Sequence, residues 1–383
     1  MTSRIYGLDI LRAAAIFSVV YVHGVSYVPS VDIQAYLYLF TFDGVSMFFV
    51  LSGFLVGGIL LQIAQQPVIT RHDLLSFWMR RWLRTLPAYY LVLIILILSS
   101  YVGQGVWPHK VYKYLTFTQN FANIPLDTYR HPYLWFYPEA WSLSVEEWFY
   151  FLIPLGLFTL INYVKIERKK LIFLFIVGSI ILTGAFRLYM VFRMHDHSAE
   201  SWDLYIRKVV VTRLDSIMFG VLGAYIHLYY KKYFFAWTMQ SFLIGMGLLL
   251  FDKTGAYLFG LTLDYYRYFS LSVTAVGTLL LLPKLTTIKN GTGPIFKLIT
   301  LISTLSYSMY LLNYTPIKNG LVPVLTRFFE LEKNSVWILF AQQYLLYWGL
   351  TIGIAYLIYR FYELPIMNLR DSLPFSQKPK ESA

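Results

Sequence analysis

The sequence predicts an all-α, polytopic integral membrane protein with about ten transmembrane helices. Hydrophobic residues make up 57% of the chain and charged residues only 14%, whereas a soluble domain carries about 25% charged residues. The apolar residues gather in runs long enough to cross a bilayer core, which takes about 20 residues per helix. These runs lack strict alternation, so they indicate helices rather than the strands of a barrel.

The expected spans form one transmembrane domain, residues 1–370, followed by a short cytoplasmic tail, residues 371–383. The sequence shows no internal repeat, and the first span is expected to remain uncleaved. In order the spans are Leu8–Val28, Ala35–Ile63, Leu86–Val102, Glu147–Tyr163, Leu171–Phe192, Val209–Tyr230, Phe235–Phe251, Ala256–Leu282, Leu298–Asn313 and Val336–Tyr359.

The distribution of positive charge predicts how the chain lies in the membrane. With the N-terminus inside, the inner segments hold eighteen Lys and Arg and the outer segments ten. Because cytoplasmic loops are enriched in these residues, both termini are expected to be cytoplasmic. The same distribution explains the net charge of +12 without nucleic acid as a partner. The absence of cysteine excludes disulfides, a thiolate zinc site and a cysteine nucleophile.

The first span carries charged and polar residues at depths where each costs about 2.5–3.5 kcal/mol. Arg12 and His23 are eleven residues apart, so on a helix they share one face and lie about 16 Å apart along the axis. Asp9 precedes Arg12 by one turn and can pair with it. In the bland interpretation Arg12 extends to the cytoplasmic surface and His23 is an interfacial aromatic residue.

Two further groups of charged residues stand at the ends of spans. Arg80, Arg81 and Arg84 close an inner loop, where their guanidinium groups could bind phosphate or serve as a positive-inside anchor. Glu146 and Glu147 open the fourth expected span at the outer face, the depth expected for His23. A carboxylate there could orient the imidazole, or it could simply favour a helix N-terminus.

Seven motifs along the chain occur together in a recognisable order. They are Leu8-Asp9 with Arg12 and His23, the run 48–55, Arg81 and Arg84 with Pro87, the run 141–150, Arg213-Leu214-Asp215 with Phe219-Gly220, the run 306–311, and Tyr362-Glu363-Leu364-Pro365. In order and spacing the sequence resembles the acyltransferase-3 family of membrane proteins.

This resemblance implies ten helices, an acyl-CoA donor (acetyl-CoA in the simplest case) from the cytoplasm, and O-acylation of a glycan or other hydroxyl compound at the outer face. It implies His23 as catalytic residue and Glu146 as its acidic partner. Arg12, Arg80, Arg81 and Arg84 would bind the donor, and no metal is needed. Asn313 stands where the family often has His, so it is assigned no acid–base role, and Ser46 occupies a place often held by Asp.

Several features leave two interpretations open. The glycines at 53, 57 and 58 are expected to be close-packing points between helices, and Arg213 with Asp215 could be an ion pair or part of a functional site. Aromatic residues of the loop 103–141, among them Trp107, Tyr129, Tyr133, Trp135 and Tyr137, could stack on sugars or form an interfacial belt. An exporter of a glycosylated or hydrophobic solute is the alternative function, although the lack of repeats counts against it.

Overall fold

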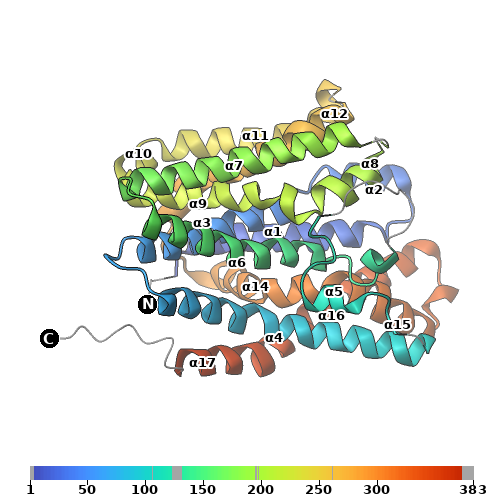
Figure 1. Ribbon diagram of the computed structural model, residues 1–383. Helices are drawn as coiled ribbons and strands as arrows, with labels where there is room; N and C mark the ends of the chain where they lie inside the picture. Colours follow the sequence, from blue (N-terminus) through green and yellow to red (C-terminus); the bar gives the residue numbers. More distant parts are fainter. Residues whose placement is uncertain are drawn as a thin grey trace.

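The computed structural model describes residues 4–105, 107–122, 132–194, 196, 198–260 and 262–372, and within these ranges all regular structure is helical (Figure 1). The α-helices are α1 (Tyr6–Val25), α2 (Val31–Tyr38), α3 (Gly44–Ala64), α4 (Arg71–Gln104), α5 (Val111–Leu115), α6 (Ala140–Tyr163), α7 (Arg168–Arg193), α8 (Ala199–Trp202), α9 (Leu214–Tyr229), α10 (Lys231–Ala236), α11 (Thr238–Phe259), α12 (Leu263–Tyr265), α13 (Leu271–Thr287), α14 (Gly293–Leu312), α15 (Val322–Phe328), α16 (Val336–Ile358) and α17 (Leu364–Ser372). Short π-helical turns lie at η2 (Asp203–Arg207), η4 (Tyr266–Ser270), η5 (Asn313–Leu321) and η7 (Tyr359–Glu363), and 3₁₀ turns at η1 (Pro132–Trp135), η3 (Val210–Thr212) and η6 (Leu331–Lys333).

The helices confirm an all-α polytopic membrane protein. Eight segments of the described chain are long and apolar enough to span a membrane, built on α1, α3, α4, α6, α7, α13, α14 and α16. Helix α9 is apolar but has only 16 residues, and α11 has 22. Every expected span overlaps at least one helix, but only eight segments meet the length and hydropathy of a span. The total of ten therefore stays a prediction.

Four expected boundaries are wrong, each for a local reason. The run 35–63 is two helices, because Asp43 caps a new helix through its side chain at Ser46. The run 256–282 contains a turn at Gly260, whose φ of 63° ends α11 in the left-handed region. In the run 209–230, regular α-helix begins only at Leu214. Finally, α6 begins at Ala140 rather than Glu147, so Glu146 lies almost two turns inside the helix.

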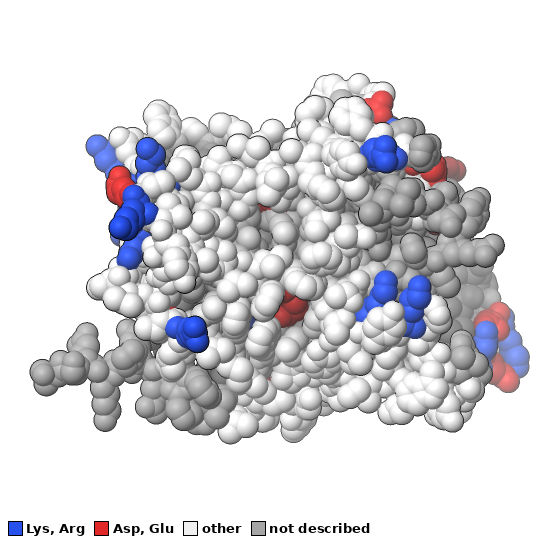
Figure 2. Space-filling model, in the orientation of Figure 1, with Lys and Arg blue, Asp and Glu red and all other residues white. Residues whose placement is uncertain are grey.

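The start of α1 and the C-terminal helix α17 lie at the same end of the bundle, on the left in Figure 1, as an even number of crossings requires. Lys and Arg gather at the two ends of the molecule, with a broad, almost uncharged band between them (Figure 2). That this left end faces the cytoplasm stays a prediction, as does the domain boundary at residue 370. The tail from residue 373 on lies outside the described residues.

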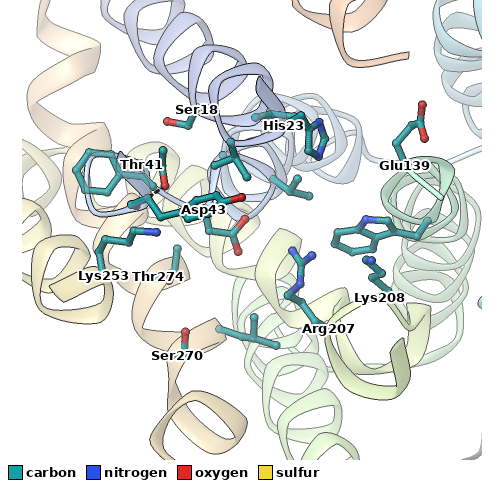
Figure 3. Close-up of a pocket in the computed structure, with 18 of the residues that line it drawn as sticks. Ser18, His23, Thr41, Asp43, Glu139, Arg207, Lys208, Lys253, Ser270 and Thr274 are labelled. Carbon is teal, nitrogen blue, oxygen red and sulfur yellow. Dashed lines mark hydrogen bonds between the residues drawn. The ribbon is translucent and has the colours of Figure 1, made fainter. Parts of the chain in front are cut away.

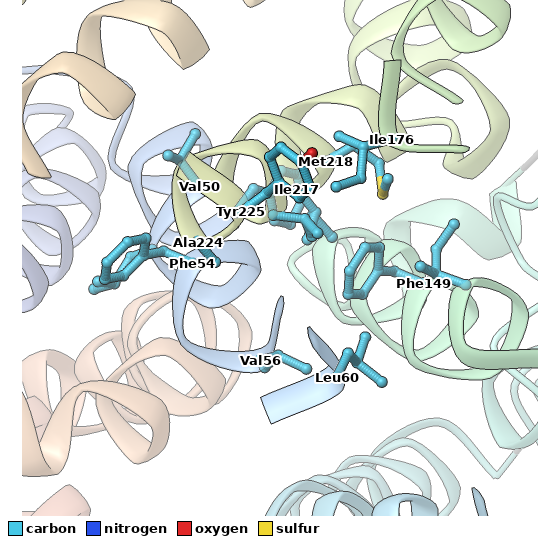
Figure 4. Packing of buried hydrophobic residues seen from close by; sticks show 14 of the residues in the cluster. Val50, Phe54, Val56, Leu60, Phe149, Ile176, Ile217, Met218, Ala224 and Tyr225 are labelled. Atoms are coloured by element: carbon cyan, nitrogen blue, oxygen red, sulfur yellow. The ribbon is translucent and has the colours of Figure 1, made fainter. Parts of the chain in front are cut away.

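Helices α3 and α9 pack closely against each other in the apolar core (Figure 4). A Cβ atom at Gly53 would lie 1.9 Å from the carbonyl oxygen of Ile217, and one at Gly220 would lie 2.0 Å from that of Val50. Gly57 also faces α9, but Gly58 faces open space. Close packing is therefore confirmed for Gly53 and Gly57 and wrong for Gly58. Without side chains at the contact, the two backbones approach as they do in small-residue membrane interfaces.

A buried ion pair ties α7 to α9, although its partners differ from those expected. Arg187 Nη1 lies 2.7 Å from Asp215 Oδ2, and both side chains are almost fully buried. Arg187 also donates to Ser272 Oγ at 2.6 Å. Arg213 instead donates to Ser46 Oγ at 2.7 Å, so Asp215 takes Arg187 rather than Arg213 as its ion-pair partner, and the interpretation of Arg213 with Asp215 as an ion pair is not supported.

The α3–α9 contact predicts opposite outcomes for two alanine substitutions in the same helix. Gly53→Ala should destabilise the protein by about 1–3 kcal/mol, since the new methyl group overlaps a backbone carbonyl. Gly58→Ala should be neutral or stabilising by up to about 1 kcal/mol. Thermal unfolding of both variants in detergent measures the difference, and equal midpoints would show that α3 and α9 do not pack this closely.

Candidate active site

A cavity of about 570 Å³ lies at the end of the bundle opposite the termini. It is enclosed by the C-terminal end of α1, the α2–α3 junction, the start of α6, η2, α11, η4 and η5. His23 lines it, together with three carboxylates, three cations and several aromatic rings (Figure 3). The charged residues are Asp43, Glu139, Asp252, Arg207, Lys208 and Lys253.

His23 is held at the cavity wall by Asn313. Its Nδ1 lies 2.5 Å from Asn313 Oδ1, while Asn313 Nδ2 donates to the carbonyls of Met309 and Tyr310, both at 2.9 Å. Because these two carbonyls accept from the amide nitrogen, the amide oxygen must face the imidazole. An oxygen can only accept, so Nδ1 carries the proton and Nε2 keeps its lone pair.

The position of Asn313 follows from the local backbone. It is the first residue of η5, a π-helical turn that follows α14 and contains Pro316. Such wide turns often occur at functional sites. Asn313 is completely buried. The hydroxyl of Tyr347 lies 3.0 Å from the carbonyl oxygen of Val20 and 3.4 Å from Asn313 Oδ1, so its one proton can be donated to either. The sequence interpretation assigned Asn313 no acid–base role, which agrees with an amide, but it missed the residue as the partner of the histidine.

The sequence interpretation expected Glu146 to be the partner of His23, but the structure does not bring the two side chains together. Glu146 accepts a hydrogen bond from Tyr150 Oη at 3.2 Å, and the same hydroxyl lies 2.8 Å from Ser52 Oγ. The guanidinium of Arg81 lies over the Tyr150 ring, 5.3 Å from its centroid. Helix α6 begins earlier than expected, at Ala140. Glu146 therefore lies about 10 Å further along the helix axis than Glu139, which lines the cavity. Glu146 therefore belongs to the arginine-rich part of the bundle.

Glu139 is the carboxylate that lies at the level of His23. Its two oxygens accept from the Thr315 backbone N–H at 2.8 Å and from the Thr315 hydroxyl at 2.6 Å, two residues after Asn313. Burial raises the pKa of Glu139 to about 7, so the group can exchange a proton near neutral pH. The sequence carried a weak signal for this residue, a lone acidic side chain before Trp141 in a stretch interpreted as loop.

The arginines expected to bind the donor gather at the opposite end. Arg84, Arg4 and Arg81 are among the charges that act on Arg12. Asp9 lies 3.6 Å from Arg12, as expected, but is closer to Arg4, at 2.5 Å. Arg80 lies on α4, the helix that also carries Arg81 and Arg84, and its side chain is exposed. Since α1 is continuous from Tyr6 to Val25, Arg12 and His23 are separated by about 16 Å.

Ser46, which the resemblance places where Asp is often found, has an acidic neighbour one turn before it, Asp43. Asp43 accepts from both the backbone N–H and the hydroxyl of Ser46, and that hydroxyl oxygen accepts from Arg213. Arg213 is completely buried and lies over Phe49 and Trp141. A short polar chain thus runs from the cavity to a buried guanidinium, which no single sequence motif indicates.

The aromatic residues of the preceding loop divide between core and cavity. Tyr137 is completely buried and donates to the carbonyl of Leu311, so it is neither a sugar platform nor a belt residue. Trp135 lines the cavity, and Trp107 is exposed and packs on Tyr101. Tyr129 and the side chain of Tyr133 lie outside the described residues.

Comparisons with known proteins agree with this architecture. A "Putative O-acetyltransferase" of Staphylococcus aureus strain COL is 31% identical over 228 residues, which cover 57% of this chain and 34% of that protein. The peptidoglycan O-acetyltransferase OatA of Listeria monocytogenes is 24% identical over 391 residues, covering 89% of this chain and 56% of that protein. The O-acetyltransferase OatA of Staphylococcus aureus strain NCTC 8325 is 26% identical over 234 residues, 57% of this chain and 34% of its own length.

The chain thus spans about a third to just over half of the length of these relatives. No solved structure matches it at a significant level. The acyltransferase-domain family (Acyl_transf_3), however, matches residues 5–360, nearly the whole chain. As the series of motifs predicts, this membrane protein belongs to the acyltransferase-3 family.

Proposed function

We propose that the protein is a membrane O-acetyltransferase that takes an acyl group from cytoplasmic acyl-CoA and delivers it to a hydroxyl of a glycan at the outer face. The main support is the imidazole of His23, fixed by Asn313 with Nε2 unprotonated, at the wall of a cavity. Family membership and the names of the relatives support the same activity. Since those relatives are bacterial, the membrane proposed is the bacterial plasma membrane.

The donor would enter at the end that holds the termini. Arg12, Arg81 and Arg84 lie close enough to act on one another electrostatically, and forked guanidinium groups suit the phosphates of coenzyme A. The acyl-pantetheine arm, which is narrow and extended, would then cover the distance of about 16 Å to His23. Glu146 and Tyr150 lie beside Arg81 on this route, where we propose that they hold the guanidinium in place.

At the cavity the reaction needs only proton transfer and a positioned thioester. His23 Nε2 takes the proton of the acceptor hydroxyl, and the oxygen attacks the thioester carbonyl carbon. The tetrahedral intermediate then expels the thiolate of coenzyme A, which takes the proton back from Nε2. A positioned general base contributes about 10²–10⁴-fold to such a rate, and the thioester itself supplies the activation.

The acceptor follows from the cavity's position and lining. Its hydroxyl must reach His23 from the outer face, where Trp135, Trp141 and Trp202 line the cavity and could stack on sugar rings. One relative is named as a peptidoglycan O-acetyltransferase. We therefore propose a surface glycan as the acceptor.

Removing the base should slow transfer strongly while leaving donor binding intact. His23→Ala should lower kcat about 10²–10⁴-fold, whereas Asn313→Leu should lower it about 5–100-fold, because the base remains and its orienting hydrogen bond is lost. Asn313→Asp loses the amide donor but keeps an oxygen that accepts from Nδ1, so it should lower kcat less than Asn313→Leu. Release of free thiol from labelled acyl-CoA in detergent, coupled to product formation, measures all three. Wild-type-like turnover by His23→Ala would exclude this mechanism, and a wild-type protein that moved solute without thiol release would be an exporter.

Removing the arginine cluster should affect the donor alone. Arg81→Gln with Arg84→Gln should raise the KM for acyl-CoA about 10–100-fold, as expected when charged hydrogen bonds to phosphate are lost, with little change in the KM for the acceptor. Lys169→Gln is the matched control, because this lysine lies over the Tyr230 ring, 4.2 Å from its centroid, away from the cluster. An unchanged KM for acyl-CoA in the double variant would assign these arginines to membrane anchoring.

A further inference from the structure

Arg207 and Lys208 lie across the cavity from His23 (Figure 3), and the proposed reaction gives them no part. Arg207 is the last residue of the short turn η2 and Lys208 comes directly after it, so both lie outside the membrane-spanning helices. The geometry points to an anion subsite: we propose that this pair binds one carboxylate or phosphate group of the acceptor, so that the acceptor is an acidic glycan. The inference rests on the proposed function and specifies its substrate.

Arg207 is held with its terminal nitrogens unused. Its Nε donates to Asp203 Oδ1 at 2.5 Å, and its guanidinium lies over the Trp141 ring, 5.3 Å from the centroid. Within the described part of the chain its two terminal nitrogens have no hydrogen-bond partner, and they are not sealed from solvent. Figure 3 shows them directed into the cavity. A guanidinium fixed in this way presents the fork that binds carboxylate or phosphate through two parallel hydrogen bonds.

Lys208 is fixed beside Arg207 and shares its counter-ion. Its Nζ lies 2.5 Å from Asp203 Oδ2, and its carbonyl accepts from Asn120, which also donates to the carbonyl of Trp141. Asn120 thereby joins η2 to the start of α6. Burial lowers the pKa of Lys208, because taking an ammonium group out of water disfavours its charged form.

The carboxylates of this wall hold the two cations in place without using the whole guanidinium. Asp203 pairs with both Arg207 and Lys208, and Asp43 also acts on Arg207 and on the buried Arg213. Within the described residues, however, the only hydrogen bond from the Arg207 side chain is the one that Nε donates to Asp203. The two terminal nitrogens therefore remain as donors for a ligand anion, at a site that is preformed.

The other carboxylates of the cavity are already engaged. Both oxygens of Glu139 accept from Thr315, and the oxygens of Asp252 accept from Tyr265 and Thr274. None of these hydrogen bonds involves Arg207, so neither carboxylate occupies its terminal nitrogens. The anionic group bound at Arg207 would fix the acceptor while a neighbouring hydroxyl is presented to His23.

The first test identifies the charge of the natural product. Cells that express the protein are fed labelled acetate, and the acylated glycan is purified and analysed by mass and electrophoretic mobility. We expect a carboxylate or phosphate on the acylated sugar or on its neighbour. A glycan that bears no anionic group there would overturn the inference while leaving the proposed transferase function intact.

The second test measures recognition with the full chain reconstituted in vesicles. The native glycan is compared with the same glycan neutralised by amidation of its carboxylates or by removal of its phosphates, which also distinguishes the two anions. For the wild type, neutralisation should raise the KM at least about tenfold, since a charged, bidentate hydrogen bond is lost. Arg207→Gln and Lys208→Gln should each raise the KM for the native glycan and reduce this discrimination, with the KM for acyl-CoA unchanged.

Lys333→Gln removes an exposed cation that pairs with Glu330 and should keep the full preference for the charged glycan. Arg207→Lys should recover part of the affinity, because charge remains but the fork is lost. If Arg207→Gln weakened both glycans equally, or weakened acyl-CoA instead, the subsite assignment would be wrong. Absence of any acyl transfer by the wild type would instead refute the proposed function on which the inference rests.

Discussion

The hydrogen bond between His23 and Asn313 is the contact on which the candidate site depends. It joins α1 to the start of η5, two segments almost three hundred residues apart in the chain. Because the amide nitrogen of Asn313 is committed to two carbonyls of α14, the bond selects one tautomer of the imidazole. In the proposed reaction, the direction of proton transfer follows from that selection.

The rest of the bundle supports this contact at two levels. Helix α1 packs along α14 and is tied to it at the other end, where Asp9 accepts from Ser303 and Arg4 donates to Thr304. The side of α1 that faces α14 thus carries an arginine near one end and the histidine near the other. On the far side of the cavity, α3 and α9 meet through glycines. This contact brings the hydrogen-bonded series of Asp43, Ser46 and Arg213 against Trp141. Arg12 and the imidazole of His23 are thereby held about 16 Å apart by one continuous helix.

Hydropathy predicted where helices lie because apolar runs have few alternatives in a bilayer. It failed where protein rather than lipid surrounds the helix. The segment 140–146 contains two serines and a glutamate, yet it is helical and largely buried, so the start of α6 was placed too late. This error in turn put Glu146 at the wrong depth and paired it with His23. The break before α3 was missed because it depends on one capping carboxylate, Asp43.

The candidate site shows the same division. His23 and the arginine cluster follow from charge at span depth and from helical spacing, both local properties. Asn313 as the partner of the histidine, Glu139 at its level, and Arg187 as the partner of Asp215 depend on contacts between distant helices. Single-sequence patterns do not carry that information, since a buried amide or a lone acidic residue fits many loops equally well.

The tautomer of His23 tests the central claim most directly. Nitrogen-15 NMR of the protein with labelled histidine rings, recorded near neutral pH in detergent, separates protonated from unprotonated ring nitrogens. The protein has seven histidines, and the signal that disappears in His23→Ala identifies this one. The account predicts a proton on Nδ1 and a bare Nε2. A proton on Nε2 with a bare Nδ1 would contradict it, because the nitrogen that faces the acceptor would then be unable to act as a base.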